Sequence, residues 1–329
     1  MSTAQDVLVT VVIPAKNEEA AIGPCLQSVL SQDYTNLQVI VVDGASDDGT
    51  EMVVKQIAAD DPRVELIHNE HGLIPISLNR AVDAARGTYL VRIDAHCTVP
   101  SDYVGRAIGH LRSGQWAGVG GRKDGVGKTS AGRAIAAAMG SPFGVGNSTY
   151  HYGVDEQVVE HIPFGSYPLD VIRGAGGWDE RFRVNQDFEF DYRLREAGGK
   201  LLFDPQLTIH WECRQSIPDL FTQYKRYGRG KVKVAMRHPR SLRLRHLAAP
   251  ALVAAAAVAP VVATKRPKTV LAGAAVYGAA LAAASRSTAA EVPAADRRWV
   301  PAAFLAMHVG WGIGFWQGVA HGLRERSVT

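Results

Sequence analysis

A carboxylate and an imidazole, Asp94 and His96, stand two residues apart where an apolar run ends. The run, Tyr89–Ile93, predicts a buried strand. Side chains two positions apart in extended backbone point to the same side, so one metal ion could contact both groups. Pro100 closes the segment, because proline cannot extend a central strand. The alternative is a plain strand end with a solvated aspartate and a histidine that binds nothing.

Two further polar segments also follow apolar, β-branched runs. Pro14–Glu18 comes after Val7–Ile13, and Asp43–Asp48 comes after Leu37–Val42. Such runs are typical of buried parallel strands. Ligands of open α/β sheets gather at the carboxyl ends of the strands. One crevice could therefore hold these two segments together with Asp94 and His96.

Helical and extended patterns alternate along this half of the chain. A third strand is predicted over Val64–His68, and Gly87 stands where a helix should stop. Helices are predicted over Ala20–Leu30 (interrupted early by Gly23-Pro24), Glu51–Ala59 and Leu78–Ala85. The alternation predicts an α/β sandwich with right-handed crossovers. Neither a GxGxxG nor a GxxxxGK[ST] motif follows the first strand, which argues against dinucleotide and P-loop folds. A metal on Asp94 and His96 would then be the natural group to neutralise phosphates.

Composition divides the 329 residues into two regions. Overall 47% of the residues are hydrophobic and 21% are charged, which is compatible with a folded core. The part beyond residue 246 is mostly Ala, Val, Leu and Gly. The 3 cysteines lie far apart and indicate a reducing compartment without a disulfide or zinc framework. The N-terminus lacks a signal-peptide pattern, so we expect this part of the chain in the cytosol.

Three segments resemble the nucleotide-sugar half of family 2 glycosyltransferases, which have the GT-A fold: VTVVIPAKNEEAAIGPCLQSVLSQ, VIVVDGASDDGT and LNRAVDAARGTYLVRIDAH. The resemblance runs from about Val7 to Lys231. DAH, SPFGVGNSTY, IPFGSY and QYKRYGRGK are most similar to membrane-bound exopolysaccharide enzymes of the succinoglycan-biosynthesis type. We therefore expect a GT-A catalytic domain over residues 1–231, a basic juxtamembrane linker over 232–246 and membrane-associated helices over 247–323.

For the donor, the resemblance implies that Pro14, Ala15 and Glu18 line the nucleotide site. It also implies that Asp43 accepts a hydrogen bond from the uracil N–H of a UDP-sugar, as an ionised carboxylate can. Turn and helix-cap chemistry is the alternative role for Asp43 and the polar residues after it. Asn79 and Arg80 are predicted to reach the sugar or the phosphates, with a solvated helix face as the alternative.

For the metal, the family pattern reads Asp-x-Asp, so His96 is a departure from it. Imidazole is a poorer ligand for Mg²⁺ than for Mn²⁺, and we therefore expect Mn²⁺ to support activity at least as well as Mg²⁺. The ion would bridge the two phosphates of the donor. Related enzymes also have a histidine at the position of His210, which could ligate the metal, contact the diphosphate or be structural.

For the catalytic base, the resemblance points to Asp187 in VNQDFEFDYRLREAGGK, where Gln186 replaces the more usual Glu. Asp187 would take the proton from the acceptor hydroxyl as that hydroxyl attacks the anomeric carbon. A single base opposite the leaving group implies direct displacement with inversion. Glu189 and Asp191 are competing candidates, or else carboxylates favoured at a helix N-terminus.

For the acceptor, Trp178 follows the glycines of Gly174–Gly177 and could pack on the apolar face of a sugar, or else lie in the core. Gln223, Arg226 and Tyr227 resemble a Q-x-x-R-W motif with Tyr in place of Trp. In relatives that motif covers the site, and its arginine meets the diphosphate with fixed charge and bidentate geometry. A cationic helix on the membrane surface is the alternative.

The apolar segments of the C-terminal region are Leu247–Ala263, Thr269–Ala284 and Trp299–Ala320. A full membrane span needs about 20 residues, and only the third segment reaches that length easily. The first two could be short spans or a shallow hairpin. The stretch Lys225–Arg245 contains Lys and Arg but no Asp or Glu. Its place beside apolar segments favours anionic membrane lipids over nucleic acid as its partner.

These features predict an inverting, metal-dependent glycosyltransferase. It would move a sugar from a UDP-sugar to a polyprenyl-linked saccharide at the cytoplasmic face of the inner membrane. One alternative is transfer to polyprenyl phosphate itself, for which no strong base is needed. Another is a membrane protein that binds nucleotide sugars without catalysis.

Overall fold

A computed structural model describes residues 7–326 of the chain, with side chains to residue 324. The described residues form two compact units. The first contains the chain up to Asp124 together with Gly153–Trp211, and the second contains Gly125–Tyr152 and the chain from Glu212 onward. The predicted domain divisions after residues 231 and 246 stay predictions, although helix α9 (Ile217–Arg237) runs through the first of them without a break.

A mixed β-sheet with the strand order β3-β2-β1-β4-β8-β6-β9-β5 organises the first unit, and β7 pairs with β9. Strands β1 to β4 pair in parallel, whereas β8 is antiparallel to β4. The predicted α/β fold is confirmed. The strands are β1 (Val9–Ala15), β2 (Leu37–Asp43), β3 (Val64–His68), β4 (Tyr89–Arg92), β5 (Cys97–Thr98), β6 (Gly118–Val126), β7 (Gln157–Val159), β8 (Ser166–Pro168) and β9 (Leu201–Glu212).

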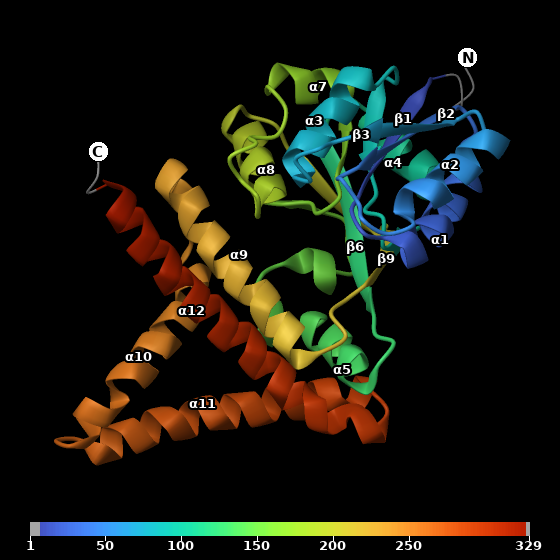
Figure 1. Ribbon diagram of the computed structural model, residues 1–329. Helices are drawn as coiled ribbons and strands as arrows, with labels where there is room; N and C mark the ends of the chain where they lie inside the picture. The colour runs from blue at the N-terminus through green and yellow to red at the C-terminus, as the bar shows by residue number, and fades with distance from the viewer. Residues whose placement is uncertain (1–6, 327–329) are drawn as a thin grey trace. The chain divides into compact units, whose positions relative to one another are not determined.

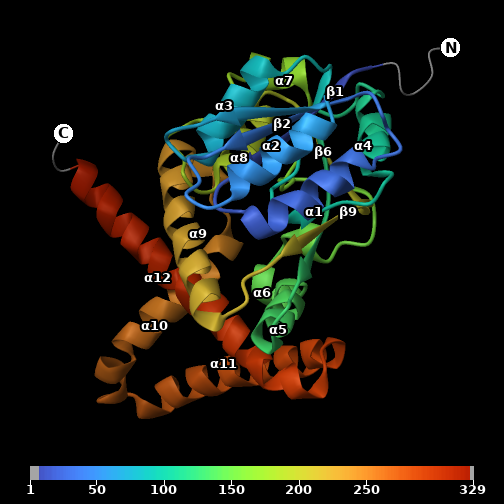
Figure 2. The ribbon, with the colours of Figure 1, turned by 45° about the vertical axis from the view of Figure 1, so that its right-hand side comes forward.

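Helices cover both faces of this sheet (Figure 1). A core cluster joins β1, β2 and β4 to α3, α7 and α8 on one face. Helices α1 and α2 run along the other face (Figure 2). The helices of the first unit are α1 (Glu19–Leu30), α2 (Thr50–Asp60), α3 (Ile74–Ala84), α4 (Tyr103–Leu111), α7 (Leu169–Gly174) and α8 (Gln186–Glu196).

Two prolines stand inside elements that they were expected to end or interrupt. Pro14 belongs to β1. The carbonyl of Val12 accepts from the Ile93 N–H, so the backbone of Val12 is directed toward β4, and that of Pro14, two residues on, is directed the same way. The pairing of β1 with β4 ends at Val12, so no β4 acceptor is left unpaired by the N–H that Pro14 lacks. Pro24 lies within α1, which continues through it. The buried side chains around it, such as Leu26, outweigh the one helical hydrogen bond that proline removes.

The second unit is helical within the described residues. Its α-helices are α5 (Ser130–Met139), α6 (Pro142–Val145), α9 (Ile217–Arg237), α10 (Ala248–Ala263), α11 (Pro267–Thr288) and α12 (Val300–Arg326). Short 3₁₀ turns cover Thr149–His151, Pro239–Ser241, Leu244–Leu247, Ala289–Glu291 and Ala294–Trp299. Two helical segments, Leu244–Ala263 and Pro267–Glu291, are long and apolar enough to cross a membrane, and little of either is buried inside the protein.

Helix α12, the longest of the three apolar segments, lies against another helix of the second unit. The segment that looked most like a span packs along α9, and its glycines allow the close approach. A Cβ atom added at Gly314 would lie 2.0 Å from the carbonyl oxygen of Lys225, and one added at Gly310 would lie 2.7 Å from that of Phe221. Among the described residues α12 is not one of the two segments that are long and apolar enough to cross a membrane, and its small-residue face is occupied by α9. The membrane association of this third segment stays a prediction.

Candidate active site

Arg92, the last residue of β4, joins two carboxylates from distant parts of the chain. Its Nε atom donates to Asp94 Oδ1 at 2.9 Å, and its Nη1 atom donates to Asp187 at the start of α8. The guanidinium is only 2% exposed. Burial opposes its charge, but the two carboxylates outweigh that effect and raise the pKa of Arg92 above its ordinary value. The predicted metal ligand and the predicted base thus share one cation.

The three acidic residues of α8 have different surroundings. Asp191 is fully buried, and its carboxylate is hydrogen-bonded to Tyr167, Ile162 and His161. Glu189 is also buried and pairs with Arg193 at 2.9 Å. Asp187 keeps 18% of its side chain exposed. Of the three, Asp187 alone combines access to solvent with the link to Asp94.

The pKa of Asp187 lies above the ordinary aspartate value. Burial raises the pKa of this carboxyl, and the positive charge of Arg92 offsets only part of the rise. A carboxylate with a raised pKa holds a transferred proton more readily than an ordinary aspartate does. The electrostatics of this position therefore suit a general base.

A second carboxylate orients the imidazole of the predicted metal pair. The Nδ1 atom of His96 lies 3.0 Å from Glu18 Oε1. Histidines that bind metals usually hold a carboxylate on one ring nitrogen, which orients the other nitrogen for the ion. Asp94 and His96 supply an oxygen and a nitrogen donor, a set that suits Mn²⁺. Asp94 and His96 therefore fit a divalent cation, and Glu18, which was predicted to line the nucleotide site, contacts His96.

His210 does not join this pair. In the β5–β9 ladder it stands opposite Thr98, while its neighbour Trp211 stands opposite Cys97. The ring of Trp211 lies 6.4 Å from that of His96. Successive side chains of a strand face opposite ways, so His210 is turned to the other face and is exposed. Among the described residues, the ligand atoms of His210, Asp94 and His96 do not all lie within 4.8 Å of one another. The structure does not support His210 as a third ligand.

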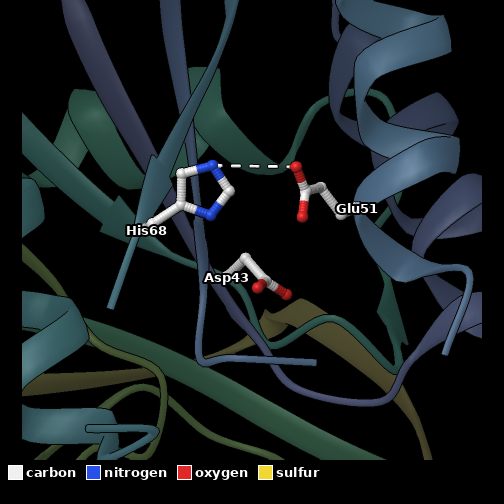
Figure 3. Close-up of side chains that lie close together, drawn as sticks. All are labelled: Asp43, Glu51 and His68. Atoms are coloured by element: carbon white, nitrogen blue, oxygen red, sulfur yellow. Dashed lines mark ion pairs between the residues drawn. The ribbon is translucent and has the colours of Figure 1, made fainter. Parts of the chain in front are cut away.

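The predicted base-binding residue, Asp43, ends β2 next to Ala15 of β1. Its Oδ2 atom accepts from the Ser46 N–H at 3.2 Å, whereas its Oδ1 atom is buried without a partner. Leaving a buried acceptor unsatisfied costs about 1–3 kcal/mol, so a ligand N–H would be favourable here. Figure 3 shows that Glu51 and His68, which lie 3.8 Å apart, face the same space as Asp43. This corner thus offers acceptors to a nucleotide base.

Packing explains three other predicted site residues. The side-chain amide of Asn79 bonds to both the backbone N–H and the carbonyl of Trp178 at 2.9 Å. Arg80 donates to the carbonyl of His68. Trp178 is 2% exposed and stacks on Phe190 with the ring centres 4.7 Å apart. The structure therefore places Trp178 in the core, where it presents no face to an acceptor sugar.

The remaining predicted residues, Gln223, Arg226 and Tyr227, belong to α9 in the second unit. The amide of Gln223 donates to the Tyr227 hydroxyl at 3.0 Å, which fixes these two side chains relative to one another. Their contacts with a donor or an acceptor, and that of Arg226 with the diphosphate, stay predictions.

Two cations of the site are absent from the sequence-based expectations. The sequence does carry a signal for Arg92, since it is the one charged residue in the apolar run Tyr89–Ile93. A buried charge of this kind usually has a charged partner, which would have marked Arg92 as part of an ion pair. Lys123 gave no such signal, since it lies in the polar stretch GRKDG of β6. Its Nζ atom lies 3.7 Å from the ring centre of Trp211 and 4.5 Å from that of Phe164. Burial lowers the pKa of Lys123 to about 8.

Comparisons with known proteins identify the family of the chain. Residues 10–163 match the model of the family described as Glycosyl transferase family 2. The chain is 31% identical over 316 residues to a succinoglycan biosynthesis protein, ExoA, of Rhizobium meliloti, with 93% of each chain covered. It is 25% identical over 233 residues to the dolichyl N-acetyl-α-D-glucosaminyl phosphate 3-β-D-2,3-diacetamido-2,3-dideoxy-β-D-glucuronosyltransferase of Methanococcus voltae, with 68% of this chain and 72% of that one covered.

Two solved structures share the fold at low identity. A mannosyltransferase of Pyrobaculum calidifontis, solved with GDP-Man and Mn²⁺, has a TM-score of 0.67 at 20% identity, with 94% of this chain and 86% of that one covered. GalNAc-T7, solved with UDP, GalNAc and Mn²⁺, has a TM-score of 0.52 at 17% identity, with 71% and 51% covered. Both likenesses support the GT-A fold.

Proposed function

Because this chain belongs to glycosyltransferase family 2, we propose that it transfers a sugar, with inversion, from a UDP-sugar to a lipid-linked saccharide in the synthesis of a cell-surface glycan. The observation that carries the proposal is the bridge through Arg92, which holds the partly exposed Asp187 beside Asp94. One base next to one metal-binding carboxylate suits a single displacement.

In the reaction, the acceptor hydroxyl attacks the anomeric carbon of the donor sugar, and the bond from that carbon to the diphosphate oxygen breaks. A carboxylate oxygen of Asp187 takes the hydroxyl proton, while Arg92 fixes the position of that carboxylate. The Oδ1 atom of Asp43 accepts the base N–H and so anchors the nucleotide. One displacement without a covalent intermediate inverts the anomeric centre.

A divalent cation on Asp94 and His96, Mn²⁺ at least as readily as Mg²⁺, would neutralise charge on the departing nucleoside diphosphate. Support for this role comes from the Glu18–His96 pair, which leaves the other imidazole nitrogen free for an ion. Manganese is also present in the two solved relatives named above.

We place the protein at the cytoplasmic face of the inner membrane. Support comes from the two exposed apolar helices and from the basic residues of α9 and the segment after it. Lys and Arg next to membrane segments are attracted to anionic lipid headgroups. A catalytic domain held there could meet an acceptor whose sugar is presented by a polyprenyl lipid.

A donor screen followed by one substitution tests the function. We expect UDP-sugars, compared with GDP-sugars, to raise the melting temperature of the full chain in detergent when Mn²⁺ is present, because ligands of the native state stabilise it. Asp187→Asn should then lower transfer to a lipid-linked saccharide by about 10²–10⁴-fold, the usual contribution of a general base. Donor binding should not change. Asp170→Asn, at an exposed position on α7, is the control.

Two outcomes would redirect the proposal. Near-normal transfer to polyprenyl phosphate by the Asp187→Asn variant would mean that the acceptor is a phosphate, which needs no base. Absence of any nucleotide-sugar binding, with or without Mn²⁺, would contradict the donor assignment.

A further inference from the structure

Lys123 is a cation of the first unit to which the proposed reaction gives no role. Its ammonium group lies between the rings of Trp211 and Phe164, at 3.7 and 4.5 Å from their centres. Within the described residues, no carboxylate pairs with this ammonium and no acceptor takes its hydrogen bonds. It therefore brings three unused donors to the site.

The aromatic rings do not replace an anion. A cation–π contact returns only part of what an ammonium loses when it leaves water, and a ring face accepts no conventional hydrogen bond. Burial already lowers the pKa of Lys123 to about 8, as expected for a desolvated ammonium without a counter-ion at contact distance. The position favours an incoming negative group.

The charges around Lys123 indicate which negative group it would bind. Asp94 and Asp187 attract Lys123 from a distance, but within the described residues both pair with Arg92 and neither forms an ion pair with Lys123. Trp211, whose ring contacts the Lys123 ammonium, also lies beside His96 of the predicted metal pair. The free ammonium thus stands on the side of the site where a diphosphate would lie.

We propose that Lys123 binds a phosphoryl group of the substrates, with the diphosphate of the donor as its first ligand. The inference rests on the proposed function, because it takes the donor to be a nucleotide sugar. A flexible lysine can follow the diphosphate as charge grows on it, whereas Arg92 is held in place by two carboxylates. A phosphate on the acceptor lipid is the other source of the same chemistry.

The test compares Lys123→Met, Lys123→Arg and Lys200→Met in the full chain, with Lys200 as an exposed lysine just before β9. Binding of UDP, GDP, uridine and guanosine is measured by calorimetry with Mn²⁺ present. We expect Lys123→Met to weaken binding of the preferred diphosphate by about 10–100-fold and to leave nucleoside binding unchanged. Lys123→Arg should recover much of the loss, and Lys200→Met should match the wild type.

The second phosphate source has its own result. If Lys123→Met leaves diphosphate binding unchanged but raises the KM for the lipid-linked saccharide acceptor about ten-fold or more, the phosphoryl group belongs to the acceptor. If both constants stay unchanged in a folded variant, the assignment of Lys123 is overturned.

A measurement on the wild type covers the case in which Lys123→Met does not fold. Lysine acylation followed by mass spectrometry should show that UDP or GDP with Mn²⁺ protects Lys123 and leaves Lys200 reactive. Equal labelling of Lys123 with and without a nucleotide that binds would count against the inference. Failure of the wild type to bind any nucleotide would contradict the proposed function instead, so the two failures are distinguishable.

Discussion

At the scale of single residues, the candidate site contains two pairs in which one side chain holds another in position through a hydrogen bond. Arg92 holds Asp187, and Glu18 holds His96. Each pair joins residues from distant parts of the chain, and in each pair the second member is the predicted base or metal ligand. Two predictions follow from these pairs, and each can be measured without knowledge of the natural acceptor.

The first concerns the pH dependence of transfer. The base acts when it is ionised, so kcat/KM should fall as the pH drops through the raised pKa of Asp187, and the acid limb should lie above the ordinary aspartate value of about 3.9. Burial and the carboxylates of Asp94 and Asp191 raise this pKa, whereas Arg92 and His161 lower it. Replacing Arg92 by Met should therefore move the limb to higher pH.

The control for this profile is Arg92→Lys, which keeps the positive charge and should keep most of the wild-type limb. An acid limb that stays in place in a folded Arg92→Met variant would show that Arg92 does not act on Asp187.

The second concerns metal affinity. Glu18→Ala removes the carboxylate that orients His96, and such outer-shell losses typically cost about 10–100-fold in metal affinity. The free Mn²⁺ signal in electron paramagnetic resonance reports binding directly. Glu196→Ala, at the exposed far end of α8, should bind Mn²⁺ as the wild type does. Equal affinity in all three proteins would remove Glu18 from the metal site.

At the scale of elements, the pairing of α12 with α9 is a feature that composition alone does not predict. Glycines let the two backbones meet, and the added Cβ at Gly314 would lie 2.0 Å from a carbonyl oxygen. Gly314→Val must therefore separate the helices, and overpacking of this kind costs about 1–3 kcal/mol. Thermal unfolding in detergent should show a lower melting temperature.

The matched control for this helix pair is Gly273→Val in α11, where an added Cβ meets nothing within 4 Å. It should unfold with the wild type. If the two variants unfold at the same temperature, the glycines of α12 do not determine its packing on α9.

At the scale of the whole molecule, the second unit carries two apolar helices whose side chains are largely exposed, among them Val258 at 54% and Val276 at 72%. We expect the full chain to resist extraction by salt and alkali and to require detergent. Val258→Asp with Val276→Asp should release part of it, because an acidic residue near the centre of a span costs about 2.5–3.5 kcal/mol. Membrane fractionation measures this.

Val154→Asp provides the control, since Val154 is 73% exposed but belongs to the first unit. This variant should fractionate as the wild type does. Release of the wild type by salt alone would mean that the helices do not enter the bilayer.

Several features of this protein follow from local sequence pattern alone. Apolar runs located strands β1 to β4, and the polar residues at their ends located Asp43 and Asp94, because alternation and strand ends are properties of neighbouring residues. The family could also be recognised from the sequence, since its motifs are short and contiguous. The comparisons confirmed it.

Which side chains and helix faces meet could be learned only from the folded chain. It brought Arg92 to Asp187 across 95 positions, buried Trp178 against Phe190, turned His210 away from His96 and packed α12 on α9. None of these contacts can be predicted from a local sequence pattern, because each depends on the register of a strand or on the face that a helix presents to a distant partner. The residue types specified the available chemistry, and the packing of remote elements selected the groups that can perform it together.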